Sequence, residues 1–190
     1  MSAQPLGVVL AGGSGRRMGG QKSLVELNGR ALLLYPIGAL REVLDEVVVV
    51  CKEHTPLPEL GDSVSIWCEG EERTHPLFGV RSALRRTAED DRSVLVCAGD
   101  MPLVTAGAVR ALLGAPAAPA AVARAGGRLQ PLLARYAPAA LAVFDAMDPD
   151  EPATRIVERL DPLVIDVDES VGFNVNAPED LLLAERERER

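Results

Sequence analysis

A glycine-rich stretch carrying three cations, residues 12–22, follows the aliphatic run at residues 7–11. Glycine lets a backbone approach a phosphate chain closely and turn its N–H groups inward. Arg16, Arg17 and Lys22 add positive charge there, with no Asp or Glu among them. The stretch has neither the Gly-Lys-Ser/Thr of a Walker A loop nor the glycine order of dinucleotide folds. We therefore predict a phosphate-binding loop of another kind, with a plain surface loop as the alternative.

An aspartate after a second aliphatic run supplies the next chemical group. Asp100 follows residues 94–98 within the sequence Gly99-Asp100-Met101-Pro102. Mg²⁺ is a hard cation that binds through one or two carboxylates together with phosphate oxygens. An aspartate in an ordinary turn is the alternative. Because the cationic loop should lie at the same sheet edge, we predict that Asp100 binds Mg²⁺.

Two asparagines further along the chain form the third motif. Asn174 and Asn176 lie two residues apart, so in an extended segment their side chains face the same way. Either amide oxygen could complete a metal shell beside a carboxylate. An asparagine ahead of a helix that begins at Pro178 is also common as an N-cap. From the residues alone, capping is the favoured interpretation.

These residues need a scaffold that brings distant loops together, and the chain alternates strand and helix patterns. Strands are predicted at residues 7–11, 46–51, 64–68, 94–98, 121–124, 132–135 and 163–167. Helices are predicted at residues 31–44, 77–88, 106–113 (with Thr105 as N-cap), 138–147 and 154–160, and from Pro178 onward. Repeated β–α units predict an α/β fold, with a mostly parallel central sheet and helices on both faces. Ligands then bind beyond the carboxyl ends of the strands.

Length and composition limit the class of protein. The chain fits one α/β domain, residues 1–190, with a charged and frayed tail at residues 185–190. Aromatics make up only 3%, so the core should consist of Val, Leu, Ile and Ala. The net charge of -8 argues against a nucleic-acid partner. With no membrane-spanning run, no signal peptide and three cysteines expected as buried, reduced thiols, we predict a cytoplasmic protein.

The three motifs, in this order and at these distances, resemble the molybdenum cofactor guanylyltransferase family over residues 8–183. The stretches that carry the resemblance are LAGGSGRRMGGQK, CAGDMP and FNVNAPEDL. The first is shared in looser form with many nucleotidyltransferases, and the last is more selective. The resemblance implies a Rossmann-like nucleotidyltransferase fold, Mg²⁺ as cofactor, GTP and molybdopterin as substrates, and pyrophosphate as product. It also implies contact with molybdoenzyme-maturation proteins.

The resemblance assigns roles to residues by their positions. Nucleotide binding is implied for Leu10, Ala11, Gly12, Gly13, Arg17, Lys22, Glu69, Gly79 and Asp100. Of these residues, the catalytic ones would be Arg17, Lys22 and Asp100. Asp100 and Asn176 would hold the metal. Acceptor binding is implied for Gln130, Pro131, Asn174 and Asn176.

Three positions depart from the family's pattern. Gln21 stands where an acid usually precedes the lysine, and Ala177 replaces a threonine. His75 replaces the first glycine of the Gly-Pro-Leu-x-Gly turn that borders the nucleotide and that ends here at Gly79. The resemblance therefore leaves the role of His75 open.

The residues identify the phosphate chemistry more clearly than they identify the base or the acceptor. The region that should read the base is acidic, with Glu69, Glu71 and Glu72, and the sequence does not decide between them. A cytidylyltransferase or sugar-phosphate nucleotidyltransferase of the same fold, or a non-catalytic nucleotide-binding module, remains the alternative. Lys22→Ala is expected to impair turnover more than Lys52→Ala, since Lys52 shows no special feature in the sequence.

Overall fold

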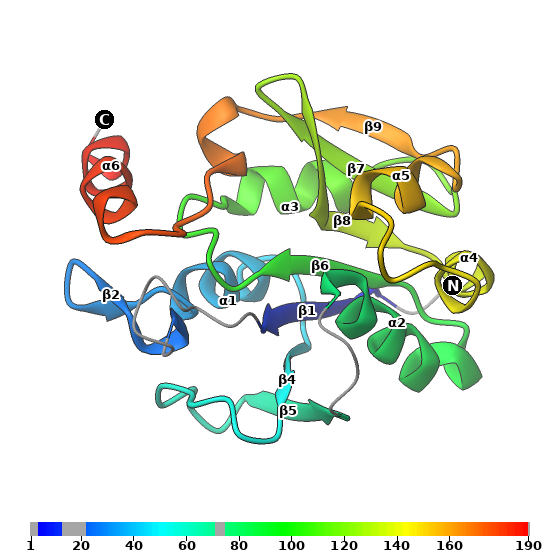
Figure 1. The fold of residues 1–190 in the computed structure, drawn as a ribbon, viewed down its shortest axis with the longest axis horizontal. Helices are drawn as coiled ribbons and strands as arrows, with labels where there is room; N and C mark the ends of the chain where they lie inside the picture. The colour runs from blue at the N-terminus through cyan, green and yellow to red at the C-terminus, as the bar shows by residue number, and fades with distance from the viewer. Residues whose placement is uncertain (1–3, 13–21, 71–74, 190) are drawn as a thin grey trace.

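The structure is a computed structural model that describes residues 4–12, 22–70 and 75–189 (Figure 1). A seven-stranded sheet runs through the molecule in the order β5-β4-β1-β6-β8-β7-β9. Its strands are β1 (Leu6–Ala11), β4 (Val47–Lys52), β5 (Val64–Glu69), β6 (Val94–Ala98), β7 (Ala120–Ala125), β8 (Arg128–Tyr136) and β9 (Leu163–Asp166). β8 pairs antiparallel with both of its neighbours, and the other pairs are parallel. The prediction of a mostly parallel sheet is confirmed.

Helices cover both faces of this sheet, as the sequence predicts. α1 (Leu34–Arg41) and α3 (Ala106–Leu113) pack on one face. α2 (Pro76–Thr87), α4 (Leu141–Asp145) and α5 (Ala153–Glu158) pack on the other. α6 (Pro178–Arg188) lies apart, against the small hairpin of β2 (Glu26–Leu27) and β3 (Arg30–Ala31). Single 3-10 turns occur at Lys22–Leu24, Ala88–Asp90, Pro138–Ala140 and Glu169–Gly172.

The run of valines in β4 shows why the central strands are aliphatic throughout. Val47 and Val49 belong to the core under α1 and α3, whereas Val48 and Val50 belong to the core under α2. All four are at most 2% exposed. Alternate side chains of a strand point to opposite faces, so a strand covered on both faces must be apolar at every position.

Two elements differ from their predictions because of how their residues pair with a neighbouring strand. The helix predicted at residues 31–44 begins at Leu34, since Arg30 and Ala31 pair with β2 instead. β8 is nine residues long, where four were predicted. Its register with β7 shifts between Ala123↔Gln130 and Val122↔Ala134, so residues 131–133 bulge out of that ladder. Pro131, which has no N–H to donate, lies at this bulge.

The charged segment at residues 185–190 was expected to fray, but the structure describes it as helical through Arg188. The Arg188 guanidinium lies 4.4 Å from the ring centre of Tyr35 and donates a hydrogen bond to the Pro102 carbonyl. The cation–π contact and the hydrogen bond hold this end of α6 against the body of the protein.

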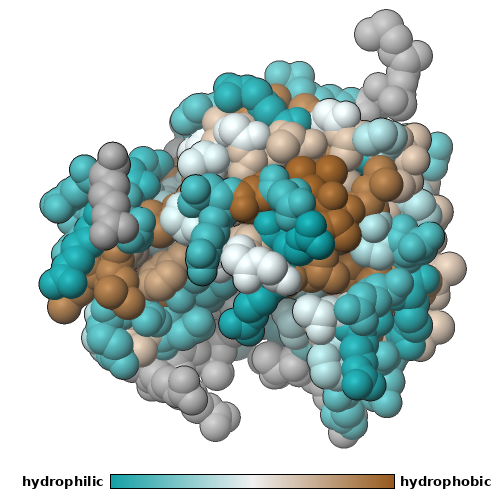
Figure 2. All heavy atoms as spheres, turned by 90° about the horizontal axis from the view of Figure 1, so that it is seen from above, coloured by the Kyte–Doolittle hydropathy of each residue, from teal (hydrophilic) through white to brown (hydrophobic). Residues whose placement is uncertain are grey.

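Two observations concern the apolar character of the helices and of the surface. Within the described ranges, no helix is long and apolar enough to cross a membrane. The exposed large hydrophobic side chains of the same ranges are Ile66, Val164, Leu182 and Leu183, on the two edge strands of the sheet and on α6. Figure 2 shows one face on which apolar residues gather in a central area surrounded by hydrophilic ones.

The cysteines only partly match their prediction. All three are free thiols, but Cys68 is exposed, and only Cys51 and Cys97 are buried. Burial first, and then the neighbouring Cys68, raise the pKa of Cys51 to about 11. The Cys51 thiol therefore stays protonated at neutral pH.

Candidate active site

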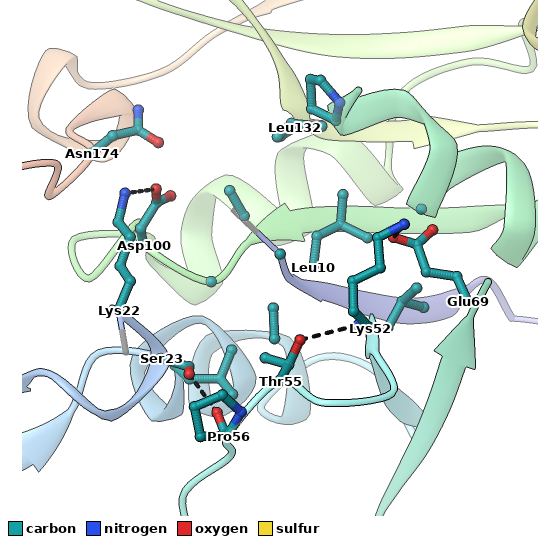
Figure 3. Close-up of a pocket in the computed structure, with 18 of the residues that line it drawn as sticks. Leu10, Lys22, Ser23, Lys52, Thr55, Pro56, Glu69, Asp100, Leu132 and Asn174 are labelled. Carbon is teal, nitrogen blue, oxygen red and sulfur yellow. Dashed lines mark hydrogen bonds and ion pairs between the residues drawn. The ribbon is translucent and has the colours of Figure 1, made fainter. Parts of the chain in front are cut away.

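A pocket of about 460 Å³ opens beyond the carboxyl ends of β1, β4, β5 and β6 (Figure 3). It is lined by Leu10, Ala11, Gly12, Lys22, Ser23, Leu33, Val50, Lys52, His54, Thr55, Pro56, Glu69, His75, Pro76, Gly79, Ala98, Gly99, Asp100, Leu132 and Asn174. Parallel strands end at the same edge of a sheet, which is why residues far apart in sequence meet there. The pocket lies where the sequence predicts ligand binding.

Lys22, Asp100 and Asn176 form a polar cluster at one end of this pocket, shown on the left of Figure 3 for the first two. The Lys22 ammonium lies 2.5 Å from Asp100 Oδ2 and donates to Asn176 Oδ1 at 2.8 Å. The Lys22 and Asp100 side chains are 17% and 24% exposed. Three residues predicted as a functional set are therefore in direct contact.

The backbone around Asp100 fixes its position closely. Gly99 donates its N–H to the Leu10 carbonyl at 3.0 Å. A Cβ at Gly99 would come within 2.7 Å of Leu33 Cδ1 and 3.0 Å of that carbonyl, so a larger residue would crowd the end of β1 and the Leu33 side chain. The Asp100 carbonyl accepts from the Val175 N–H at 2.9 Å, which attaches the segment carrying the asparagines.

Neither asparagine caps α6: Asn174 lines the pocket, Asn176 contacts Lys22, and another residue binds the N–H groups at the start of the helix. Asp180 accepts hydrogen bonds from the backbone N–H groups of Asn176 and Ala177 at the start of α6. Asn174 lines the pocket, and its side chain donates to the Gly172 carbonyl at 2.9 Å. The capping interpretation of the asparagines is therefore wrong.

A second lysine–carboxylate pair lies at the opposite end of the pocket, on the right of Figure 3. The Lys52 ammonium lies 3.3 Å from Glu69 Oε1 and donates to the Gly70 carbonyl at 2.8 Å. Thr55 Oγ1 accepts from the Lys52 N–H at 3.1 Å. The expectation that Lys52 is an unremarkable lysine is wrong. Its place at the end of β4, beside the end of β5, was the signal that could have found it.

His75, the residue that replaces a glycine of the family pattern, caps α2 at the edge of the pocket. Its Nδ1 accepts from the Leu77 N–H at 3.2 Å, and its Nε2 lies 3.2 Å from the Glu151 carbonyl. With Nδ1 accepting from Leu77, Nε2 is the ring nitrogen left to donate to the Glu151 carbonyl. One turn later, a Cβ at Gly79 would come within 2.8 Å of Leu10 Cδ2, so α2 packs closely on β1 at the pocket.

Several other lining residues were not predicted from the sequence. Ser23 donates to the Pro56 carbonyl at 2.5 Å and thereby closes one wall. Leu132 reaches the pocket from the bulge in β8. Gln130 and Pro131, predicted to bind the acceptor, do not line this pocket, and a Cβ on Gly172 would meet Gln130 Nε2 at 2.9 Å. Their acceptor role stays a prediction.

Gly13, Arg16 and Arg17 lie outside the described residues, as do Glu71 and Glu72, two of the three candidates for reading the base. Leu10, Ala11, Gly12, Glu69 and Gly79, predicted to bind nucleotide, all line the pocket.

Comparison with known proteins gives a consistent assignment. Residues 7–163 match the family described as "MobA-like NTP transferase domain". The chain is 30% identical over 183 residues to the molybdenum cofactor guanylyltransferase of Ectopseudomonas mendocina, covering 93% of this chain and 90% of that relative. Two solved structures share the fold. One is the molybdopterin-guanine dinucleotide biosynthesis protein A of Archaeoglobus fulgidus (TM-score 0.73, 24% identity, 97% of this chain and 98% of that chain). The other is Rv0371C of Mycobacterium tuberculosis in complex with manganese (TM-score 0.77, 19% identity, 97% and 99%). The chain therefore belongs to the MobA-like NTP transferase family.

Proposed function

We propose that this protein transfers GMP from Mg-GTP to the terminal phosphate of molybdopterin and releases pyrophosphate. The observation that carries the proposal is one pocket with two different polar ends, Lys22–Asp100–Asn176 and Lys52–Glu69. The near-full-length relative that is named a molybdenum cofactor guanylyltransferase supports the same substrates. Delivery of the product to molybdoenzyme-maturation proteins is part of this proposal, as the family resemblance implies.

The first end fits a hard divalent cation. Asp100 Oδ1 is buried and has no hydrogen-bond partner within the described part of the chain. A buried carboxylate oxygen without a partner is costly unless a cation or water completes it. Asp100 and Asn176 offer the carboxylate and amide oxygens that Mg²⁺ accepts. Manganese in a structure of the same fold supports a divalent metal, and we propose Mg²⁺.

The reaction needs charge neutralisation and positioning more than proton transfer. An oxygen of the acceptor's phosphate attacks the α-phosphorus, and the bond from that phosphorus to the oxygen bridging to the β-phosphate breaks. The attacking phosphate is already ionised near neutral pH, so no general base is required. Lys22 and Arg17 would offset the charge that gathers on the departing pyrophosphate. Bound Mg²⁺ would supply further positive charge at the phosphates.

The second end has the right groups to read guanine. The Watson–Crick edge of guanine presents an oxygen acceptor, O6, beside the donors N1–H and N2–H₂. The Glu69 carboxylate can accept from both donors in a bidentate pair, and the Lys52 ammonium can donate to O6. Lys52 is fixed by Glu69, by the Gly70 carbonyl and, through its backbone, by Thr55. We therefore propose Glu69, with Lys52, as the reader of the base.

Thermal stabilisation by GTP, CTP, ATP and UTP, each with and without Mg²⁺, tests this function. A ligand that binds only the folded state adds about 2.7 kcal/mol at a hundredfold excess over Kd. Selective stabilisation by Mg-GTP, followed by pyrophosphate release with molybdopterin, is the expected result. A preference for CTP would move the protein to the cytidylyltransferases. Binding without pyrophosphate release would make it a non-catalytic module, and no response would remove the nucleotide site.

A further inference from the structure

The Lys22 ammonium lies between the two groups proposed to hold the metal. It is 2.5 Å from Asp100 Oδ2 and 2.8 Å from Asn176 Oδ1. We infer that Lys22 occupies the metal site of the nucleotide-free protein and leaves it only when a triphosphate arrives, so that metal and nucleotide must enter together. The inference rests on the proposed function for the roles of Asp100 and Asn176.

The contacts show how much of the site Lys22 occupies. Of the three side-chain oxygens at the cluster, Lys22 contacts two. The third, Asp100 Oδ1, is buried and unpartnered within the described residues. An Mg²⁺ bound to Asp100 and Asn176 at about 2.0–2.1 Å would lie within a few ångströms of the Lys22 ammonium, which contacts one oxygen of each residue. A metal that uses both side chains therefore competes with Lys22 for the same place.

Charge decides when that displacement is favourable. One carboxylate and one ammonium give the cluster a formal charge of zero, so an arriving divalent cation gains little attraction. It would also face the ammonium at a few ångströms, where like charges repel strongly in a partly buried site. A triphosphate reverses this balance, because it adds several negative charges and gives the ammonium new partners.

The backbone near Lys22 allows the side chain to move alone. Ser23, the next residue, is fixed through its hydroxyl to the Pro56 carbonyl. The Lys22 carbonyl accepts from the Val25 N–H at 3.3 Å. A lysine carries its charge on a flexible four-carbon stem. Rotation of that stem would carry the ammonium from Asp100 toward phosphates in the pocket without a change in the chain path.

If Lys22 occupies the metal site, its loss should change nucleotide binding and metal binding in opposite directions. A lysine that only binds phosphates would not show this. Loss of the Lys22 charge should weaken nucleotide binding and at the same time tighten metal binding to the nucleotide-free protein. The test measures binding of Mn²⁺ alone, by the electron paramagnetic resonance signal of the free ion. It compares the wild type with Lys22→Met, which keeps the length of the stem.

Lys52→Met is the matched control, because Lys52 is the other lysine of the chain and lines the same pocket at its far end. We expect Lys22→Met to bind Mn²⁺ about 10-fold more tightly than the wild type, an ordinary size for coupled sites. Lys52→Met should stay close to the wild type. Adding Asp100→Asn to Lys22→Met should abolish the gain. If Lys22→Met binds Mn²⁺ no more tightly than the wild type, Lys22 does not occupy the metal site.

A second measurement, made on the wild type, covers the case in which Lys22→Met folds poorly. Because the chain has two lysines, ¹³C-lysine labelling gives two side-chain signals, which Lys52→Met assigns. Millimolar Mg²⁺ alone should leave the Lys22 signal in place, and Mg-GTP should move it. A shift with Mg²⁺ alone, or none with Mg-GTP although GTP stabilises the fold, overturns the inference. Failure of every nucleotide to stabilise the fold would instead refute the proposed function, and the Mn²⁺ comparison would still decide the role of Lys22.

Discussion

The two ends of the pocket carry the same two groups, a lysine and a carboxylate, held in different ways. Lys52 and Glu69 are register partners at the ends of neighbouring parallel strands, so the sheet itself holds the pair together. Lys22 and Asp100 are 78 residues apart and come from separate loops. Pairing of the strands keeps Lys52 beside Glu69 whatever their side-chain rotamers, whereas Lys22 and Asp100 meet only through side chains from separate loops. A fixed pair suits recognition of a base, and an exchangeable pair suits phosphates that enter, react and leave.

The largest effect should come from the carboxylate at the exchangeable end. Asp100→Ala removes the buried oxygen proposed for the metal, so turnover should fall by about 10²–10³-fold, as for other lost transition-state contacts. Pyrophosphate release at saturating substrates measures it, and the melting temperature should change little. Asp166→Ala is a matched control, because Asp166 pairs with Arg124 on the exposed edge of the sheet. Turnover close to wild type would take Asp100 out of the metal site.

The two lysines should separate kcat from KM. Lys22→Ala should lower kcat by about 10²-fold, because its contact to the departing phosphates strengthens in the transition state. Lys52→Ala should mainly raise KM for GTP, since a base contact is the same in ground and transition states. Steady-state kinetics of both variants gives the answer. Equal losses of kcat would mean that the two ends of the pocket do not differ in function.

The choice of base should depend on Glu69. Glu69→Gln keeps the shape of the side chain but replaces one acceptor oxygen with a donor, so guanine loses half of a bidentate pair. Hydrogen bonds to charged groups are worth about 1.5–3 kcal/mol, so the preference for GTP over CTP should fall about 10–100-fold. The ratio of the two kcat/KM values measures this. An unchanged ratio would assign base reading to another residue.

The smallest effect should follow from His75→Ala. Loss of an N-cap costs about 1 kcal/mol of stability. Thr105→Ala removes the cap of α3, where Thr105 Oγ1 accepts from the Ala108 N–H, and should cost a similar amount. Denaturant unfolding compares the two. His75→Ala should also raise KM for GTP, because α2 borders the pocket, and an equal effect of Thr105→Ala on KM would show that the His75 effect is general loss of stability.

Local sequence patterns correctly predicted the elements whose environment is the same along their length or depends only on neighbouring residues. β6 covers the predicted residues 94–98, because a strand covered on both faces must be aliphatic along its whole length. The N-cap of α3 at Thr105 is confirmed for a similar reason, since capping depends only on neighbouring residues. The start of α1 and the bulge in β8 were not predicted, because the register of pairing with β2 and with β7 determines them, and residue types alone do not fix that register.

The residues of the site also divide into those that a local sequence motif identifies and those that it does not. Lys22, Asp100 and Asn176 could be grouped because each belongs to a motif with its own chemistry. Lys52 has no such motif, and its importance comes from Glu69 on the neighbouring strand. Leu132 reaches the pocket through a change of register that local pattern does not encode. Residues whose role depends on a spatial neighbour were the ones that the sequence alone did not identify.

α6 is tied at both ends to the loop that carries Asp100. Asn176, just before the helix, contacts Lys22, which also contacts Asp100. Arg188, near its other end, donates to the Pro102 carbonyl, two residues beyond Asp100. During synthesis on the ribosome, Lys22 and Asp100 therefore emerge long before the segment that completes their surroundings. A nascent chain should therefore acquire its sheet first and its activity only after residues 174–188 have left the exit tunnel.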